Sequence, residues 1–234
     1  MKDRTRREFM VNGAKLTGAA IGAATIGHGF LLVQSSEAAA EVFPESDCGV
    51  INKNGAKVLI AYASQCGSTG EVAEAIGEVL CQGGATVETK WVKNVRALDG
   101  YDAVVIGSAI QKSQWMPEAK DFLVTHQNAL SRMPVAYFLT CLTLYKQTEE
   151  THRKAKAFLN PLRKAAPQLN PVSIGRFAGV LDYSKLSFMY RTVMKRKMKK
   201  RGIPEGDFRD WDAIRAWAKE AQHAITELEQ PDRI

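Results

Sequence analysis

Residues 58–70 read VLIAYASQCGSTG, and this stretch decides the fold. It opens with a continuous apolar run and ends in a turn of glycine, serine and threonine. Apolar residues then recur at helical spacing at Val72, Ile76 and Val79. A short apolar run of this kind predicts a strand that is buried on both faces. The stretch therefore predicts a buried strand, a loop and a helix in direct succession.

The same alternation of strand and helix continues along the chain. Further strands are predicted at 87–91, 103–106, 135–139 and 173–181, and helices at 117–129, 152–166 and 212–228. We expect the helix at 152–166 to break near Pro161. The alternation predicts an α/β fold, a doubly wound parallel sheet of five strands in three layers. Because the second strand alternates polar and apolar residues, we place it at an edge, which gives the strand order 2-1-3-4-5.

Length and composition fit one domain behind a leader. The chain has 234 residues, of which 45% are hydrophobic and 24% charged, and its formal net charge is +7. This composition excludes a collagen, a low-complexity disordered chain and a membrane protein of several spans. We expect a signal over residues 1–40, a linker over 41–56 and one folded domain over 57–230.

The leader has the order of an export signal, in which a basic stretch precedes a weakly apolar stretch and then small residues. Arg6 and Arg7 form a pair typical of the twin-arginine route, and Ala38–Ala40 supply a cleavage site. An uncleaved membrane-spanning helix over 16–33 is the alternative. On either interpretation we expect the folded part outside the cytoplasm, in the periplasm or on the outer face of the cytoplasmic membrane.

Cysteine and histidine residues give no catalytic or metal site. An oxidising compartment would permit a disulfide among Cys48, Cys66, Cys81 and Cys141, but their spacing matches no metal template. The interpretation that we favour from the sequence is buried or free thiols. The histidines of the folded part occur singly in helical patterns, and no acid–base pair is apparent, so we expect no metal and no catalytic side chain.

The first loop, Ser64–Gly70, has the chemistry of a phosphate site. It opens a helix, where backbone N–H groups and the helix dipole attract an anion. Ser64, Ser68 and Thr69 add hydroxyl donors, and Gly67 lets the backbone approach a ligand closely. The loop lacks the lysine of a nucleoside-triphosphate loop and the three-glycine spacing of a dinucleotide fingerprint. It predicts a cradle for one phosphate monoester.

These residues resemble the signature of the flavodoxin family. The signature positions are Ile60, Tyr62, Ser64, Gly67, Thr69, Ala73 and Ile76, and Ala61 departs from it because a larger residue is usual there. The resemblance implies that FMN binds at three loops on the carboxyl edge of the sheet, the first holding the phosphate and the others the flavin ring. The implied cofactor residues are Ser64, Gln65, Cys66, Gly67, Ser68, Thr69, Ser108, Ala109, Ile110, Gln111, Trp115, Thr140, Cys141, Leu142 and Tyr145.

The second and third loops carry the candidate aromatic partners of the flavin. In the second loop, Gly107–Trp115, Trp115 either stacks on the ring or caps the helix that begins at Pro117. In the third loop, Thr140–Gln147, Tyr145 is the candidate for a second ring contact. The third loop is more apolar than the short acidic loop of flavodoxins, so the redox potential and the partner site stay undetermined.

A basic segment, residues 185–201, precedes the last helix. It carries eight lysines and arginines and no acid, and apolar residues recur beneath these charges at helical spacing. The pattern is typical of an amphipathic helix that binds a membrane surface or a protein partner. The alternative is a helix that packs on the core and turns its charges to water. We do not expect nucleic acid as a partner, because an exported protein seldom meets it.

The end of the chain narrows the resemblance. Residues 177–183, the basic segment and Asp210–Asp212 are similar to the flavodoxin-like menaquinone-dependent protoporphyrinogen dehydrogenases, over roughly residues 57–227. This resemblance implies an FMN oxidoreductase that passes electrons to a membrane quinone or a redox partner protein. Export argues for a branch with another electron donor, because haem precursors are oxidised on the cytoplasmic side. A flavodoxin-type electron carrier and a flavin-free envelope binding module are the alternatives.

Overall fold

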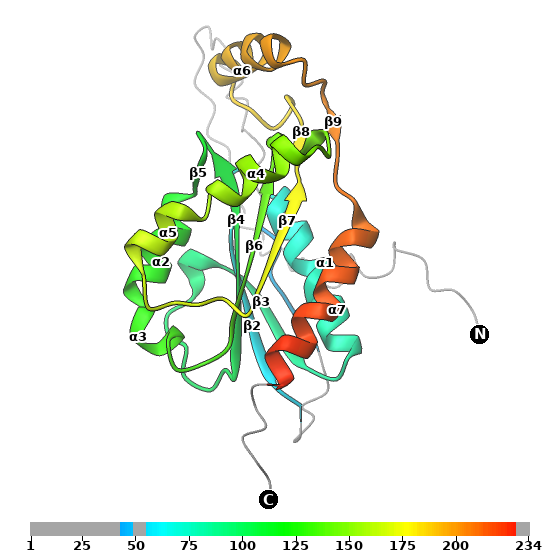
Figure 1. Ribbon diagram of the computed structural model, residues 1–234. Coiled ribbons are helices and arrows are strands. Elements are labelled where there is room, and N and C mark those ends of the chain that lie inside the picture. The colour runs from blue at the N-terminus through cyan, green and yellow to red at the C-terminus, as the bar shows by residue number, and fades with distance from the viewer. Residues whose placement is uncertain (1–42, 49–54, 228–234) are drawn as a thin grey trace, which may run out of the picture. The chain divides into compact units, whose positions relative to one another are not determined.

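A computed structural model describes residues 43–48 and 55–227 of the chain. Within these residues, seven strands form one sheet and two short strands form another (Figure 1). The strands are β1 Ser46–Cys48, β2 Lys57–Ala63, β3 Thr86–Trp91, β4 Ala103–Gln111, β5 Gln114–Trp115, β6 Val135–Cys141, β7 Ser173–Ala178, β8 Val180–Leu181 and β9 Gly206–Asp207. The expected signal lies outside the described residues.

The parallel part of the sheet has the order β3-β2-β4-β6-β7. Numbered along the chain, this is the order 2-1-3-4-5, so the fold prediction is confirmed. β2 and β6 are almost wholly buried because helices cover both faces of the central strands. The carboxyl ends of β2, β4 and β6 meet at one edge of the sheet, which brings the three loops together.

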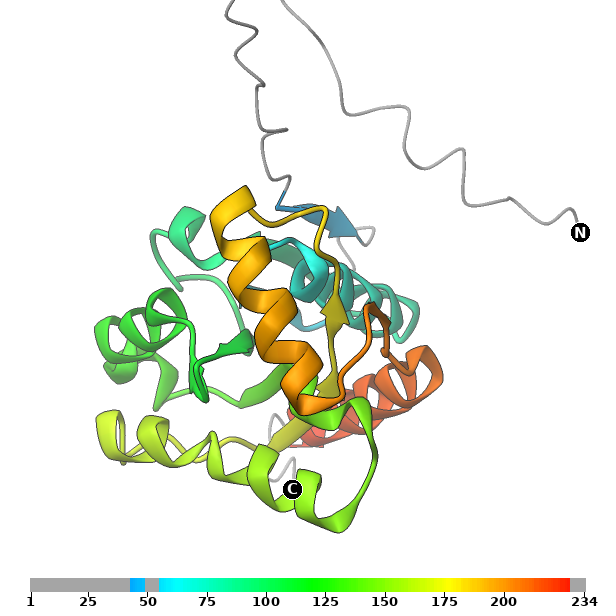
Figure 2. The same ribbon diagram turned by 90° about the horizontal axis from the view of Figure 1, so that it is seen from above.

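Helices cover the two faces of the sheet in different groups (Figure 2). α1 and α7 pack on one face around Ile60, Ile76 and Ile214, and α2, α3, α4 and α5 pack on the other around Leu59, Leu123 and Leu159. The helices are α1 Ser68–Gln82, α2 Pro117–Thr125, α3 Gln127–Leu130, α4 Glu149–Ala157, α5 Asn160–Ala165, α6 Phe188–Arg201 and α7 Trp211–Glu227. The short 3-10 helices are η1 Val92–Asn94 and η2 Leu142–Tyr145.

Two expected elements are divided. The helix expected over 152–166 ends at Ala157, and α5 begins at Asn160, because Pro161 lacks the N–H group that a continuous helix would need. The strand expected over 173–181 breaks after Ala178. Beyond this break β8 leaves the main sheet and pairs with β9, where Val180 lies opposite Asp207. In the described part of the chain no helix is both long and apolar enough to cross a membrane.

Part of the expected linker is folded. β1 adds an antiparallel edge to β3, where Asp47 lies opposite Glu88. The Tyr62 hydroxyl donates to the Pro44 carbonyl at 2.8 Å, and the rings of Phe43 and Trp91 stack with centroids 4.6 Å apart. The linker prediction is therefore wrong for residues 43–48, because β1 pairs with the otherwise open edge of β3.

The cysteine prediction is wrong in the same region. Cys48 of β1 and Cys81 of α1 form a disulfide across 33 residues of sequence. The spacing of the cysteines could not show this pairing. The disulfide forms because β1 pairs with β3 and so lies close to the last turn of α1. The disulfide attaches the N-terminal strand to the helix that follows the first loop.

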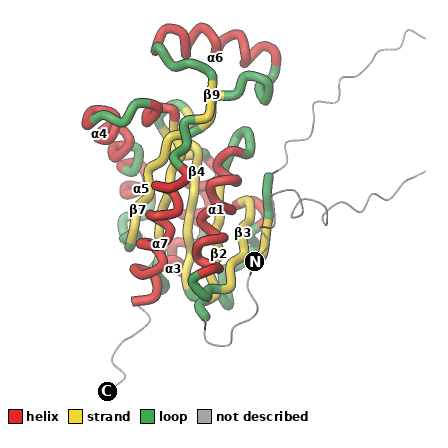
Figure 3. The backbone as a smooth tube through the Cα atoms, turned by 90° about the vertical axis from the view of Figure 1, so that its right-hand side faces the viewer, coloured by secondary structure: helices red, strands yellow, loops and turns green. Residues whose placement is uncertain are grey.

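The basic helix, α6, lies beyond the carboxyl edge of the sheet and joins the body through the β8–β9 pair (Figure 3). Met198 is buried in a small cluster with Leu181, Tyr183 and Ile203, apart from the two main cores. Phe188 and Met189 are each 81% exposed and Val193 is 61% exposed. The alternative that α6 packs on the sheet is thus wrong, because its apolar residues divide between this cluster and solvent.

Candidate functional site

The three loops predicted to form the site meet at the carboxyl edge of the sheet. Thr69 and Thr140 join the first and third loops through a hydrogen bond of 2.8 Å between their hydroxyl oxygens. The Gln111 side-chain amide donates to the Gln65 side-chain oxygen at 2.7 Å and so joins the second loop to the first. These contacts cross gaps of 71 and 46 residues in sequence, so the fold brings the predicted site residues together.

The first loop presents unused hydrogen-bonding capacity. Gly67 precedes α1 with a φ of 79°, in the left-handed region that favours glycine, and no side chain caps the helix there. Ser64 is buried, and its hydroxyl has no hydrogen-bond partner among the described residues. A buried hydroxyl without a partner is costly, as are uncapped N–H groups at a helix start. A phosphate bound here would satisfy both, so the residues fit the group that the sequence predicted.

Thr69 is buried and has a structural contact in addition to its predicted contact with the ligand. Its side chain is fully buried and is bonded to Thr140. When Thr140 donates this bond, the Thr69 hydroxyl keeps its own proton for a second acceptor. Thr69 can therefore both hold the third loop and donate to an anion in the first loop.

The second loop is a tight hairpin between β4 and β5. Lys112 and Ser113 form its turn with φ angles of 50° and 64°. The Ser108 hydroxyl accepts from the Met116 N–H at 2.9 Å and donates to the Ala109 carbonyl at 2.8 Å, so it stabilises the loop itself. Ala109, Ile110 and Gln111 are partly exposed.

Trp115 does not occupy the place predicted for it. The side chain is 2% exposed and packs edge-on against Tyr137, with ring centroids 5.7 Å apart. The prediction of a flavin-stacking face is wrong for Trp115, because the β4–β5 pairing places it opposite Ile110 and turns it into the core. Met116 occupies the cap position of α2, so Trp115 does not cap that helix either.

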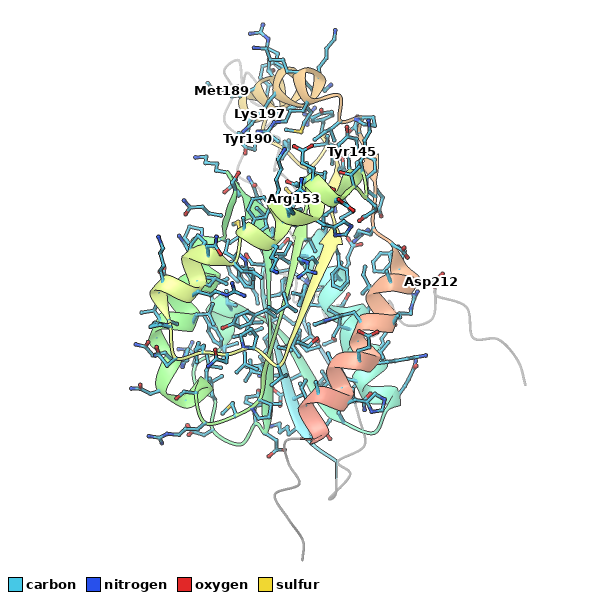
Figure 4. All side chains as sticks on the ribbon, viewed as in Figure 1. Tyr145, Arg153, Met189, Tyr190, Lys197 and Asp212 are labelled. Carbon is cyan, nitrogen blue, oxygen red and sulfur yellow. A yellow bond between two sulfur atoms is a disulfide. The ribbon has the colours of Figure 1, made fainter. Side chains whose placement is uncertain are left out.

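The third loop is ordered by packing. Cys141 is buried, and this burial raises the pKa of its thiol. Leu142 and Tyr145 pack against the α6 cluster, and the Tyr145 ring meets Phe208 edge-on with centroids 5.9 Å apart. Figure 4 shows Tyr145 and Tyr190 between α6 and the carboxyl edge of the sheet. Tyr145 thus lies at the carboxyl edge of the sheet, as predicted, and Phe208 partly covers its ring.

Three residues from the C-terminal part of the chain contact the loops and were not predicted. The Lys185 ammonium donates a hydrogen bond to the Cys66 carbonyl at 3.4 Å, and the Arg209 guanidinium donates one to the Ser68 carbonyl at 3.1 Å. The Gln111 amide donates to the Tyr190 hydroxyl at 3.4 Å. The sequence shows that residues 185–201 are basic, but no local pattern indicates which loop Lys185, Tyr190 or Arg209 contacts.

The chemistry of the site is that of an anion cradle bordered by polar amides and aromatic rings. In the described residues no group of three histidine, cysteine or acidic side chains is placed to hold a metal ion. The uncharged hydroxyls and N–H groups of the first loop suit a single phosphate. The partly exposed residues 109–111 and the Tyr145 ring of the third loop suit a flat heteroaromatic group beside the phosphate.

Comparison with known proteins finds a matching protein family and a similar individual protein. Residues 59–206 match the protein family described as "Flavodoxin domain". The chain is 29% identical over 180 residues to "Protoporphyrinogen IX dehydrogenase (quinone)" of Leishmania major, over 70% of this chain and 74% of that protein.

Solved structures of low sequence identity also match. A flavodiiron core from Synechocystis is 14% identical with a TM-score of 0.47, over 76% of this chain and 37% of that one. A flavoprotein in complex with FMN from Lactobacillus acidophilus is 20% identical with a TM-score of 0.40, over 52% of this chain and 93% of that one. The chain therefore spans little more than a third of the flavodiiron core.

Proposed function

The chain belongs to the flavodoxin domain family, and from this premise we propose that it is an exported FMN-dependent oxidoreductase that passes electrons through the flavin to a membrane quinone. The observation that carries the proposal is the first loop, where the buried Ser64 hydroxyl has no partner among the described residues beside an uncapped helix start. Bound FMN supplies the redox chemistry, and the protein supplies binding, orientation and exclusion of water.

The chain's own residues divide this work among the three loops. Ser64, Thr69 and the N–H groups after Gly67 would hold the phosphate. Residues 109–111 would border the flavin ring, and the Gln111 amide fixes this loop against Gln65. The segment that carries α6 contacts all three loops through Lys185, Tyr190 and the cluster around Met198, and so limits the entry of water.

The absorbance spectrum of the purified protein tests the cofactor. We expect a flavin spectrum and release of FMN on denaturation. Thr69→Val and Ser64→Ala should each weaken FMN binding by about 1.5–3 kcal/mol, because a hydrogen bond to a charged group is lost. Thr192→Val on α6 is the matched control, since its hydroxyl bonds only within the helix to the Phe188 carbonyl. Unchanged FMN affinity in both loop variants would refute the phosphate assignment, and bound FAD would correct the cofactor.

The quinone proposal is supported by the quinone-dependent dehydrogenase of Leishmania major, whose alignment spans most of this chain. It is tested by reducing the bound flavin chemically and following its reoxidation by a menaquinone analogue in vesicles. Rapid reoxidation supports a quinone-linked enzyme. Reoxidation by a redox protein alone would favour the electron carrier, and the absence of flavin would favour the binding module.

Export by the twin-arginine route is proposed from the pair Arg6 and Arg7 in the leader. Replacing both with lysine should retain the precursor in the cytoplasm with FMN already bound. With both arginines present, the mature protein should be recovered from the periplasm or from the outer face of the membrane. Normal export of the double variant would show that the arginine pair is accidental.

Contact with an anionic membrane is proposed for α6. Its exposed Phe188, Met189 and Val193 lie among lysines and arginines, a combination that adsorbs to anionic lipid. Each cation that reaches the lipid surface contributes about 1 kcal/mol, and salt screens this attraction. Charge reversal at Arg196, Lys199 and Lys200 should abolish binding to phosphatidylglycerol vesicles while FMN content stays normal. Lys195 is left unchanged because its ammonium lies 5.3 Å from the Tyr183 ring centroid. Undiminished vesicle binding and quinone turnover would show that the charges have no such role.

A further inference from the structure

Arg209 is a buried cation directly behind the first loop. Its side chain is 7% exposed. It donates to the Ser68 carbonyl at 3.1 Å and to the Glu71 carboxylate at 2.9 Å, both in the first turn of α1. It also forms a bidentate pair with Asp207, with contacts of 2.6 to 3.1 Å, and stacks over the Trp211 ring at 4.4 Å. A single guanidinium thus joins the segment after β9 to the start of α1.

The two carboxylates explain why a cation is needed at this point. Glu71 lies in the first turn of α1, and an acidic side chain there opposes a second anion at the same helix start. Lys185 approaches Glu71 only to 4.0 Å and is half exposed, so solvent weakens that pair. Burial lowers the pKa of Arg209, but the hydrogen bonds that its guanidinium donates to Asp207 and Glu71 outweigh this effect and raise the pKa above its ordinary value. The guanidinium therefore stays charged.

We propose that Arg209 is a positioning residue for the FMN phosphate: it offsets part of the negative charge that Glu71 and Asp207 place behind the first loop, so that the loop accepts a dianion without a cationic side chain of its own. The inference rests on the proposed function. Arg209 acts from behind because a trans peptide places the Ser68 carbonyl and the Thr69 N–H on opposite sides. The carbonyl that accepts from Arg209 therefore directs the N–H away from it, toward the predicted phosphate position.

A merely structural role makes a different prediction. If Arg209 only held the segment after β9 in place, its loss would weaken the binding of any flavin. If it offsets the charge of Glu71, its loss should weaken FMN but leave riboflavin, which has the same ring and no phosphate, nearly unaffected. The affinity ratio of the two flavins is therefore the readout that separates the roles.

The experiment measures the dissociation constants of FMN and riboflavin by flavin fluorescence quenching, on protein freed of cofactor. Arg209→Gln should raise the FMN constant at least tenfold and change the riboflavin constant less than twofold. Adding Glu71→Gln to that variant should restore part of the FMN affinity, because one of the two carboxylates that Arg209 faces is then neutral, and Arg209→Lys should keep most of the affinity. Arg215→Gln is the matched control, because Arg215 also lies over the Trp211 ring, at 6.0 Å, and pairs with Asp212 instead of Glu71.

A measurement with Arg209 intact covers the case in which its variants do not fold. Glu71→Gln alone should tighten FMN binding two- to fivefold, a gain that structural damage does not produce. Equal losses for both flavins in Arg209→Gln, or no gain in Glu71→Gln when Arg209→Gln is unfolded, would overturn the inference. A wild-type protein that binds riboflavin as well as FMN, or neither, would instead refute the proposed function, and the inference with it.

Discussion

The first loop and α6 lie at the same end of the sheet but are held in opposite ways. The first loop is fixed by Thr140, Gln111 and Arg209, from three distant parts of the chain. α6 is attached mainly through its buried Met198 and leaves large apolar side chains in solvent. Ordering a site for one small ligand requires such contacts, whereas a surface that meets a membrane must leave its apolar groups unpartnered. The difference fits the proposal that the first loop binds the cofactor and that α6 contacts the membrane.

The Cys48–Cys81 disulfide links β1 to the C-terminal end of α1, the helix that follows the first loop. Cys48→Ser with Cys81→Ser should lower the free energy of unfolding by about 3 kcal/mol, because the bond closes a long loop in the unfolded chain. Urea unfolding of the cofactor-free protein measures this loss. The wild type with a reductant is the control: it should lose the same stability, while the double variant should not respond to the reductant.

FMN affinity of the same double variant sharpens the comparison. The segment that carries β1 also holds Pro44 against Tyr62, two residues before the first loop, so we expect weaker FMN binding once β1 is released. Vesicle binding through α6 should not change. A variant that loses vesicle binding but keeps its FMN affinity would contradict the division between the two regions.

The same substitution at two glycines tests the division between the two regions. A Cβ at Gly70 would lie 2.7 Å from Pro44 Cγ and 2.8 Å from Tyr62 Cε2, so Gly70→Ala should cost about 2 kcal/mol by overpacking and should weaken FMN binding. Gly202, which ends α6, has a φ of 65° and open space around it. Gly202→Ala should cost only about 1 kcal/mol, for the left-handed backbone. Thermal unfolding and FMN titration of both variants measure the contrast, and equal effects on FMN would contradict it.

The sequence predicted the parts of the molecule that depend on local pattern. The strand-loop-helix at 58–70, the strand order and the position of the three loops follow from periodicity and turn chemistry. β1, the disulfide and Arg209 could not be predicted, because each depends on segments that are far apart in sequence. Trp115 shows the same limit in the site: its place in a loop suggested exposure, but a two-residue strand pairing turned it into the core.

The edge of the sheet that carries β1 should respond to acid. Hydrogen bonds from Lys90 and Tyr101 lower the pKa of Glu88 from 4.5 to about 2. A lowered pKa in the folded state stabilises the protein above the ordinary value, and this contribution is lost as the pH falls from about 4.5 toward 2. Because Glu88 is partly exposed, we expect the contribution to be about 1 kcal/mol. Glu88→Gln should be less stable than the wild type at pH 7, and urea unfolding should show this difference shrink as the pH falls from about 4.5 toward 2. A difference that does not shrink over this range would contradict the ionic origin.

The smallest effect on stability is expected where the effect on binding is largest. Met189 and Val193 lie one turn apart on the exposed side of α6, and Figure 4 shows Met189 beside the helix and away from the sheet. Met189→Ser with Val193→Ser should change the free energy of unfolding by less than about 0.5 kcal/mol, because these side chains are in water in the folded protein as well. The same change should reduce adsorption to anionic vesicles severalfold, since the apolar groups that enter the lipid are gone. A large loss of stability would show that the two side chains are covered by protein, and α6 would then belong with the first loop as a fixed part of the site.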